Sequence, residues 1–228
     1  MLLKLLLSTS NDPIFLAIIG IPIGLLIFFL GFSTWNVFRR VEDTPTSKVR
    51  SMAAGFIELN GKVKEIKTLT SPVSQATCVY YNVEHQTYVR SKNGGSWHTT
   101  SIDTGFQNFY LQDETGKVEI DPRKAGIDIP TDKTKYYTSD RRDVECYLAP
   151  GDMVYTLGTA MIKPGVRSAN NPENFIVTQG EGDKFFYISD KKEADVQKHL
   201  SNSAKIQIII GGIILLLSLS YLVFRFVV

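Results

Sequence analysis

The sequence has few of the residues that metal sites and nucleophilic catalysis require. It contains two cysteines, Cys78 and Cys146, and three histidines, His85, His98 and His199. No Cys-x-x-Cys pair and no His-Glu-x-x-His motif occurs, so the common patterns of zinc ligands are missing. The Gly-x-Ser-x-Gly elbow and the Gly-x-x-x-x-Gly-Lys-Ser/Thr phosphate loop are missing as well. The sequence therefore predicts no catalytic residue, no metal site and no bound cofactor.

One nucleophilic arrangement is left to consider, a cysteine beside a histidine. Cys78 and His85 are seven residues apart, and this odd spacing places them on opposite faces of a regular strand. We therefore expect Cys78 and Cys146 to be packed free thiols. A disulfide between them is the alternative in an oxidising compartment.

A surplus of charge of one sign is also missing. The net charge is +2, and apart from Lys4, Arg225 and Asp12 every charged residue lies between residues 39 and 205, where the two signs nearly balance. Aromatic side chains in this region could stack on bases, but without a basic surface we expect them to pack in the core and at its rim. Nucleic acid is therefore not an expected partner. The aromatic residues considered are Tyr80, Tyr81, Tyr88, Trp97, Phe106, Phe109 and Tyr110.

Charge is absent altogether from two long runs, residues 14–38 and 206–224. At a rise of about 1.5 Å per residue, each run covers as a helix a hydrocarbon core about 30 Å thick. The first run is too long for the apolar part of a signal peptide, and no Ala-x-Ala-like cleavage site follows it. The lipid bilayer is thus an expected partner. The sequence predicts a short tail, a transmembrane helix, one folded domain and a second transmembrane helix, at residues 1–12, 13–38, 39–205 and 206–226.

The positions of Lys and Arg predict the orientation in the membrane. Four of them follow the first apolar run, against Lys4 before it, and four precede the second, against Arg225 near its end. Positively charged flanks favour the cytoplasmic side, so we expect a cytoplasmic domain with both chain ends outside. The eight residues are Arg39, Arg40, Lys48, Arg50, Lys191, Lys192, Lys198 and Lys205.

Small residues in both apolar runs have the spacing of close helix contacts. Gly20 and Gly24 form a small-xxx-small pair, and the second run contains Gly211 and Gly212. Three interpretations are open. A generic membrane helix is favoured, and the others are pairing of the two helices and a homo-oligomer held through the helices.

Residues 109–122 carry the clearest pattern in the folded domain. Apolar and polar residues alternate in its two halves, as in half-buried strands. Between the halves lies an Asp-Glu-Thr-Gly turn, in which Asp113 can bond the backbone two residues on and Gly116 can take a positive φ. Pro122 ends the pattern, because proline cannot donate to a ladder. We predict a β-hairpin whose apolar side chains are Phe109, Leu111, Val118 and Ile120.

The segment before this hairpin predicts a helix and a long strand. Residues 45–54 predict a short helix, with Thr44-Pro45 at its start and Gly55 at its end. From Phe56 onward the alternation passes straight through Asn60-Gly61, so we expect one long strand with a bulge at Gly61 rather than a hairpin.

The remainder reads as strands and loops. Residues 123–143 are polar without a period and predict a long surface loop; residues 164–172 predict another loop. Ser189 can cap a charged helix at residues 191–203. Further strands are expected at residues 77–90, 97–102, 144–148, 153–162, 174–178 and 184–188. Many short strands without βαβ alternation predict a mainly β fold, an antiparallel barrel or sandwich between two transmembrane α-helices. The order of its turns is also OB-like, an analogy that identifies no ligand.

Several segments together resemble one family. They include Phe-Tyr-Leu-Gln-Asp-Glu-Thr-Gly-Lys-Val at residues 109–118 and Pro-Gly-Asp-Met-Val-Tyr-Thr-Leu-Gly-Thr at residues 150–159. In order and spacing the segments are similar to the GIDE ("beside a membrane") domain of mitochondrial and chloroplast outer-envelope E3 ubiquitin ligases, and of archaeal and bacterial relatives. The resemblance covers about residues 39–205. The other segments are residues 42–55, 56–63, 71–72, 78–81, 120–122 and 185–190.

The resemblance implies a function at the membrane. In those ligases a RING finger follows the second helix and recruits the E2. Here the chain ends at Val228 without a Cys/His ligand set, so we expect a relative without the RING finger. The resemblance then implies a non-catalytic module that binds or senses a protein partner. Two other hypotheses are a part in E3 activity with the RING finger on another subunit, and a scaffold in a membrane protease or stomatin-like assembly.

Overall fold

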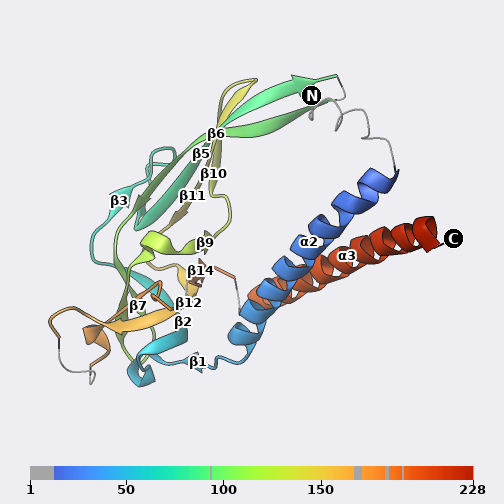
Figure 1. Cartoon of the computed structure of the whole chain (residues 1–228). Helices are drawn as coiled ribbons and strands as arrows, with labels where there is room; N and C mark the ends of the chain where they lie inside the picture. The colour runs from blue at the N-terminus through green and yellow to red at the C-terminus, as the bar shows by residue number, and fades with distance from the viewer. Residues whose placement is uncertain (1–12, 93, 167–170, 183–184, 192, 228) are drawn as a thin grey trace. The chain divides into compact units, whose positions relative to one another are not determined.

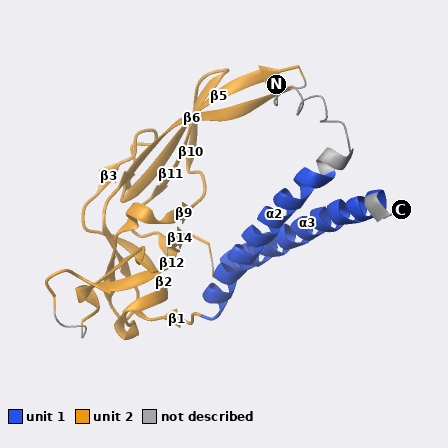
Figure 2. Ribbon diagram, viewed as in Figure 1, with its two compact units in different colours: residues 1–43, 194–228 blue, residues 44–193 orange. Residues whose placement is uncertain are grey.

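The computed structural model describes residues 13–92, 94–166, 171–182, 185–191 and 193–227. The chain forms two compact units (Figure 2). One unit, residues 44–193, is a mainly β domain. The other contains the two helices that precede and follow this domain in the sequence. The predicted fold class is confirmed.

The two helices are α2 (Pro13–Glu42) and α3 (Glu193–Val227), and both are long and apolar enough to cross a membrane. α3 is continuous over 35 residues, so the charged helix predicted at 191–203 and the membrane helix predicted at 206–226 are one helix. The backbone N–H of Lys191 donates to the Ser189 hydroxyl at 3.1 Å, but α3 begins only at Glu193, so Ser189 does not cap this helix as predicted.

The helices pack on each other through glycines. A Cβ atom on Gly24 would lie 3.2 Å from the carbonyl oxygen of Gly211, and one on Gly211 would lie 2.6 Å from the backbone nitrogen of Phe28. Backbones approach this closely only where residues are small. Of the three interpretations of these glycines, the structure supports pairing of the two helices within the chain.

Five strands of the domain form a closed barrel. Figure 1 labels β2, β7 and β12 among them. The ring of pairings is β2–β7–β8–β13–β12–β2, antiparallel except for the parallel pair β8–β13. This Greek-key order is that of the OB fold. The strands are β2 (Gly55–Glu65), β7 (Phe109–Gln112), β8 (Lys117–Ile120), β12 (Met153–Ile162) and β13 (Phe175–Thr178).

β2 closes the ring because it pairs with two neighbours in succession. Its first part pairs with β12 and its last four residues pair with β7, both without a register shift. A Cβ atom on Gly61 would lie 2.6 Å from the carbonyl oxygen of Gln112 on β7. Glycine is therefore required where the pairing of β2 changes from β12 to β7. The long strand through Asn60-Gly61 is confirmed, but Gly61 is a point of close approach and not a bulge.

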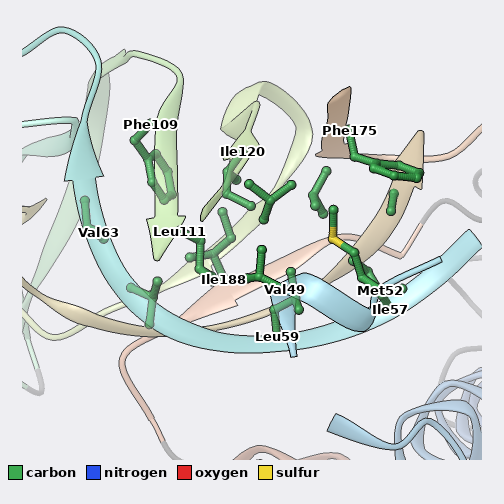
Figure 3. Packing of buried hydrophobic residues seen from close by; sticks show 14 of the residues in the cluster. Val49, Met52, Ile57, Leu59, Val63, Phe109, Leu111, Ile120, Phe175 and Ile188 are labelled. Atoms are coloured by element: carbon green, nitrogen blue, oxygen red, sulfur yellow. The ribbon is translucent and has the colours of Figure 1, made fainter. Parts of the chain in front are cut away.

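The barrel interior is the hydrophobic core, as Figure 3 shows. The alternation predicted for the hairpin of β7 and β8 is confirmed, because its four apolar side chains have no exposed surface. The buried residues of this hydrophobic core are Val49, Met52, Ile57, Leu59, Val63, Val79, Phe109, Leu111, Val118, Ile120, Leu148, Val154, Ala160, Phe175, Val177, Phe186 and Ile188.

The turn of this hairpin differs from the prediction in one respect. As expected, Asp113 bonds the backbone two residues on: its Oδ1 accepts from the N–H groups of Thr115 and Gly116, at 2.7 and 3.0 Å. Gly116, however, is not among the residues with positive φ. The Asp113 side chain satisfies the N–H groups of the turn, so the chain turns without the left-handed conformation.

The helix predicted at residues 45–54 is wrong. The segment contains β1 (Thr46–Ser47), parallel to β2, and a 3-10 turn, η1 (Val49–Ser51). The Val49 N–H donates to Asp113 Oδ2 at 2.9 Å, and the Arg50 N–H donates to Thr115 Oγ1 at 3.0 Å. Side chains of the hairpin turn thus bind the N–H groups at this point, and Gly55, at φ +126°, begins β2 instead of ending a helix.

The segments between the barrel strands form a second, four-stranded sheet in the order β10-β11-β5-β6. Its strands are β10 (Lys133–Thr138), β11 (Arg141–Leu148), β5 (Tyr80–Ser91) and β6 (Gly94–Phe106). The surface loop predicted at residues 123–143 is therefore wrong. Every residue of β10 is exposed, so its sequence has no alternation to reveal a strand.

Short elements complete the domain. They are β3 (Leu69–Thr70), β4 (Thr77–Cys78), η2 (Pro122–Lys124), β9 (Gly126–Asp128), η3 (Pro172–Asn174) and β14 (Tyr187–Ser189). The strands predicted at 153–162, 174–178 and 184–188 correspond to β12, β13 and β14. The loop predicted at 164–172 lies partly outside the described residues.

Candidate functional site

The four-stranded sheet has far less cover than the barrel. All six residues of β10 and eleven of the thirteen in β6 are exposed. A sheet normally covers at least one face with other parts of the protein. Because the outer strands of this sheet expose both faces, the sheet offers a large surface to other molecules. We therefore take it as the candidate functional site.

One face of the sheet carries a group of stacked side chains, here called the aromatic cluster: Tyr88, Trp97, Tyr136 and Arg142. The guanidinium of Arg142 lies 4.3 Å from the centre of the Trp97 ring and 5.9 Å from that of Tyr136. The Trp97 ring lies 5.2 Å from Tyr88 and 6.0 Å from Tyr136, centre to centre. These are ordinary cation–π and aromatic distances. The register explains the cluster, because Tyr88 pairs with Trp97 and Tyr136 with Arg142.

Polar side chains on the same face hold Arg142 in place. Its Nε donates to Gln86 Oε1 at 2.8 Å, and its Nη1 lies 3.2 Å from the Tyr136 hydroxyl. Gln86 in turn donates to Glu84 at 2.8 Å, and the Thr99 hydroxyl donates to the same carboxylate at 3.0 Å. A side chain that is already fixed loses less conformational freedom when a partner binds. The cluster is thus preorganised.

The opposite face of the same strands has a different character. His85 Nδ1 lies 2.7 Å from Asp143 Oδ1, and the Tyr137 hydroxyl donates to Asp143 Oδ2 at 2.8 Å. This hydrogen bond to Asp143 raises the pKa of Tyr137. The Lys135 ammonium lies 5.1 Å from the Tyr137 ring. The two faces therefore offer a partner different chemistry, one aromatic and the other charged.

A buried carboxylate joins the sheet to a loop at its base. Glu145 on β11 has no exposed surface and accepts from the N–H groups of Val73 and Ser74, at 2.8 and 2.9 Å. The Ser74 hydroxyl also donates to it. Charge-assisted hydrogen bonds of this kind are stronger than neutral ones. They fix the loop after Ser71-Pro72 to the sheet.

The cysteine and histidine residues do not form a catalytic pair. Both cysteines are free, as expected, and burial raises the pKa of the Cys78 thiol to about 11, which opposes thiolate formation. His85 contacts Asp143 instead, and His98 contacts Ser96. Among the residues that the structure describes, no group of three or more His, Cys, Asp or Glu side chains is placed to hold a metal ion.

The aromatic residues considered in the sequence analysis lie in different parts of the domain. Phe109 lies in the core and Tyr80 packs against it, and burial raises the pKa of Tyr80 to about 12. Tyr88 and Trp97 contribute to the cluster, but sequence reasoning missed Tyr136 and Arg142, because both fall in the segment read as a loop. A signal was present: Tyr-Tyr-Thr-Ser-Asp-Arg-Arg at residues 136–142 brings aromatic and basic residues together across a short turn.

A second titratable group lies in the barrel wall. Glu58 on β2 has no exposed surface, and the Thr46 hydroxyl lies 2.5 Å from one of its oxygens. The same hydroxyl lies 3.1 Å from a carboxylate oxygen of Glu193. Burial, and to a smaller extent Glu193, raises the pKa of Glu58. Burial also raises the pKa of the neighbouring Tyr155. The arrangement favours a protonated carboxyl group.

The comparison with known protein families concerns the same part of the chain. A family model matches residues 80–224, which begin at the first residue of β5 and include the whole four-stranded sheet, four of the five barrel strands and most of α3. The family is GIDE, described as E3 ubiquitin ligase. No curated protein and no solved structure matches the chain. Because the match extends over more than half of the sequence, the chain belongs to the GIDE family.

Proposed function

We propose that this chain is a membrane-anchored binding module, and that the aromatic cluster contacts a protein partner. The residue types in the cluster and their fixed arrangement carry the proposal. It combines one Trp, two Tyr and one Arg, the residue types that contribute most of the binding energy in protein interfaces. The hydrogen bonds to Arg142 hold the cluster in one arrangement before any partner arrives.

Packing within the domain gives little reason for such a cluster. The hydrophobic core consists of other side chains, and Tyr136 is 61% exposed. Exposed hydrophobic side chains mark interaction sites when they form a contiguous group, and the rings of this cluster contact one another. The sheet is also built from insertions between barrel strands, a common location for binding residues on a rigid scaffold.

Photocrosslinking in native membranes tests the proposal. Thr134 lies on β10, two residues from Tyr136 and therefore on the same face. A photocrosslinking amino acid in place of Thr134 in the full chain should capture a protein partner. Trp97→Ala should lower the yield of this adduct by about tenfold or more, because it removes the central ring of the cluster.

Tyr137→Ala is the matched control, because Tyr137 lies on the same strand but contacts Asp143 on the opposite face. It should leave the adduct unchanged, and both variants should unfold at temperatures close to that of the unsubstituted chain. Equal yields from the Trp97 and Tyr137 variants, or no adduct with the unsubstituted cluster, would contradict the proposal.

We further propose that α2 and α3 both span the membrane and that the β domain faces the cytoplasm. The length and composition of the helices and the distribution of Lys and Arg support this orientation. With the native cysteines replaced, a cysteine in place of Lys135 should resist an impermeant maleimide in intact cells, whereas one in place of Ser8 should react. Ready labelling at position 135 would reverse the orientation.

The description of the family favours a second candidate, a part in ubiquitin transfer with the RING finger on another subunit. The purified chain can be incubated with E1, E2 and ubiquitin, with and without the protein captured at position 134. Conjugates that require both the chain and the captured protein would support this candidate. Capture of a membrane protease or a stomatin-like protein without conjugates would support a scaffold role.

A further inference from the structure

The two edges of the four-stranded sheet are unlike. β10 is six residues long, contains Lys133 and Lys135, and has a register shift after Tyr136. Lysines and irregular pairing are devices that prevent a sheet edge from pairing with another strand. β6 is thirteen residues long, lacks Lys, Arg and Pro, and contains one carboxylate, Asp103. In the described part of the chain β6 pairs on one side only, with β5, so its outer edge is open to a further strand.

The structure also keeps β6 regular where its sequence would weaken it. Glycine inside a strand lacks a side chain to pack, and β6 contains Gly95 and Gly105. The ring of Tyr88 covers Gly95 and the ring of Tyr81 covers Gly105: Cβ atoms there would lie 2.5 and 2.3 Å from the rings. An aromatic ring that covers a glycine from the neighbouring strand compensates for the missing side chain. The outer edge of β6 thus keeps a regular strand conformation, without the features that protect the β10 edge from pairing.

One irregularity limits how much of the edge can accept a strand. Thr100 is an extra residue in β6, between Thr99, which pairs with Gln86, and Ser101, which pairs with His85. From residue 101 to residue 106 the register with β5 is regular. A ladder of hydrogen bonds needs a regular edge, so an added strand would pair within residues 101–106.

This regular segment is complementary to itself. Ile102, Thr104 and Phe106 share one face of the strand, and Ile102 and Phe106 are 61% and 41% exposed. If two copies pair antiparallel about Thr104, Ile102 of each copy lies opposite Phe106 of the other, and the two Thr104 residues lie opposite each other. Pairs of β-branched with aromatic residues and of Thr with Thr stabilise adjacent strands. Asp103 then lies opposite Gly105, so the two carboxylates do not face each other.

We propose that a second copy of this chain adds its β6 to this edge, antiparallel and centred on Thr104, so that the two four-stranded sheets become one continuous sheet. A second copy suits the edge because the same residues, read in the opposite direction, cover both exposed apolar side chains. The absence of Lys and Arg from β6 removes the repulsion that would otherwise oppose pairing of identical strands. A two-fold dimer is also the commonest form of homo-oligomer.

The dimer leaves the aromatic cluster accessible. Trp97 lies on β6 beyond Thr100, outside the segment that pairs. The inference therefore does not depend on the partner proposed for the cluster, and each proposal can fail without the other.

A charge exchange at the centre of the pairing tests the proposal. The molar mass of the purified full chain in detergent, measured over a dilution series, should show a dimer that dissociates on dilution. Thr104→Lys and Thr104→Glu each place two like charges opposite one another and should raise the dissociation constant by about tenfold or more. An equimolar mixture of the two variants should restore the dimer, because Lys then faces Glu.

Thr134→Lys, on the other edge of the sheet, is the matched control and should leave the dimer unchanged. Thr104 and Thr134 are both exposed, so all variants should keep the circular dichroism of the unsubstituted chain. A monomer at every concentration would overturn the proposal. So would a dimer that survives both Thr104 variants, which would place the contact elsewhere, or a mixture of folded variants that fails to associate.

Discussion

The barrel and the four-stranded sheet are made from alternating segments of one chain, but they differ in how far their strand edges and side chains are covered. The barrel strands close into a ring, and their inward side chains have almost no exposed surface. Closure removes strand edges and so removes sites of unwanted pairing. The sheet keeps two edges and exposes both faces of its outer strands. We infer that the barrel supplies most of the stability and that the inserted sheet provides the surfaces for recognition.

The first and largest expected effect compares truncations in the two regions. Leu111→Ala in the barrel should lower the free energy of unfolding by about 2–5 kcal/mol, because Leu111 has no exposed surface and its loss leaves a cavity. Val89→Ala on β5, where the side chain is exposed, should cost less than about 0.5 kcal/mol. Urea unfolding of the purified chain, followed by circular dichroism, measures both. Similar costs would show that the sheet is packed as tightly as the barrel.

The second expected effect concerns where the barrel needs glycine. Gly61→Ala should cost about 1–3 kcal/mol, because the added Cβ would lie 2.6 Å from a carbonyl oxygen on β7 and backbone must move. Gly116→Ala is the control. Its Cβ would lie 3.4 Å from the nearest atom, in Val49, at an ordinary φ, so it should change stability by less than about 0.5 kcal/mol. A large cost at Gly116 would instead support the positive φ that the sequence predicted there.

The contrast between the regions also explains which elements could be predicted from sequence. Barrel strands have one face in the core, so their residues alternate and the pattern is local. The strand predicted at 153–162 is β12 to the residue, and the hairpin of β7 and β8 was predicted with its inward residues. Closure of the ring could not be predicted, because it depends on long-range pairing of β2 with both β7 and β12.

The errors fall where local signals compete with distant contacts. Residues 45–54 have helix signals, but Asp113 and Thr115 from the hairpin turn bind their N–H groups. β10 exposes every residue, so it has no period to detect. Tyr136 was missed for that reason, and Arg142, which lies on β11, was missed because the predicted loop extended to residue 143. Exposure on both faces makes the sheet a candidate for recognition. The same exposure removes the alternation of apolar and polar residues by which a strand is predicted from sequence.

The last and smallest expected effect uses the two fully buried carboxylates, Glu58 in the barrel and Glu145 at the base of the sheet. Burial raises the pKa of Glu58 above the ordinary value of 4.5, so the fold favours its protonated form. Its contribution to stability is therefore fully present below about pH 4.5 and is lost as the pH rises through the folded-state pKa. Glu58→Gln keeps a neutral side chain at every pH and should avoid that loss.

The measurement is the difference in unfolding free energy between Glu58→Gln and the unsubstituted chain as a function of pH. Carboxylates such as Asp121, whose pKa is lowered by its hydrogen bond to Arg123, add stability that is lost on acidification, but they act equally in both proteins and cancel. The difference should grow in favour of the variant toward neutral pH, to on the order of 1 kcal/mol. Glu145→Gln, the matched control, should instead destabilise the chain at neutral pH by about 1–3 kcal/mol, because the N–H groups of Val73 and Ser74 donate to different oxygens of Glu145 and glutamine keeps only one oxygen. A difference for Glu58 that does not vary with pH would mean that the barrel holds this carboxyl group in the same charge state as the unfolded chain does.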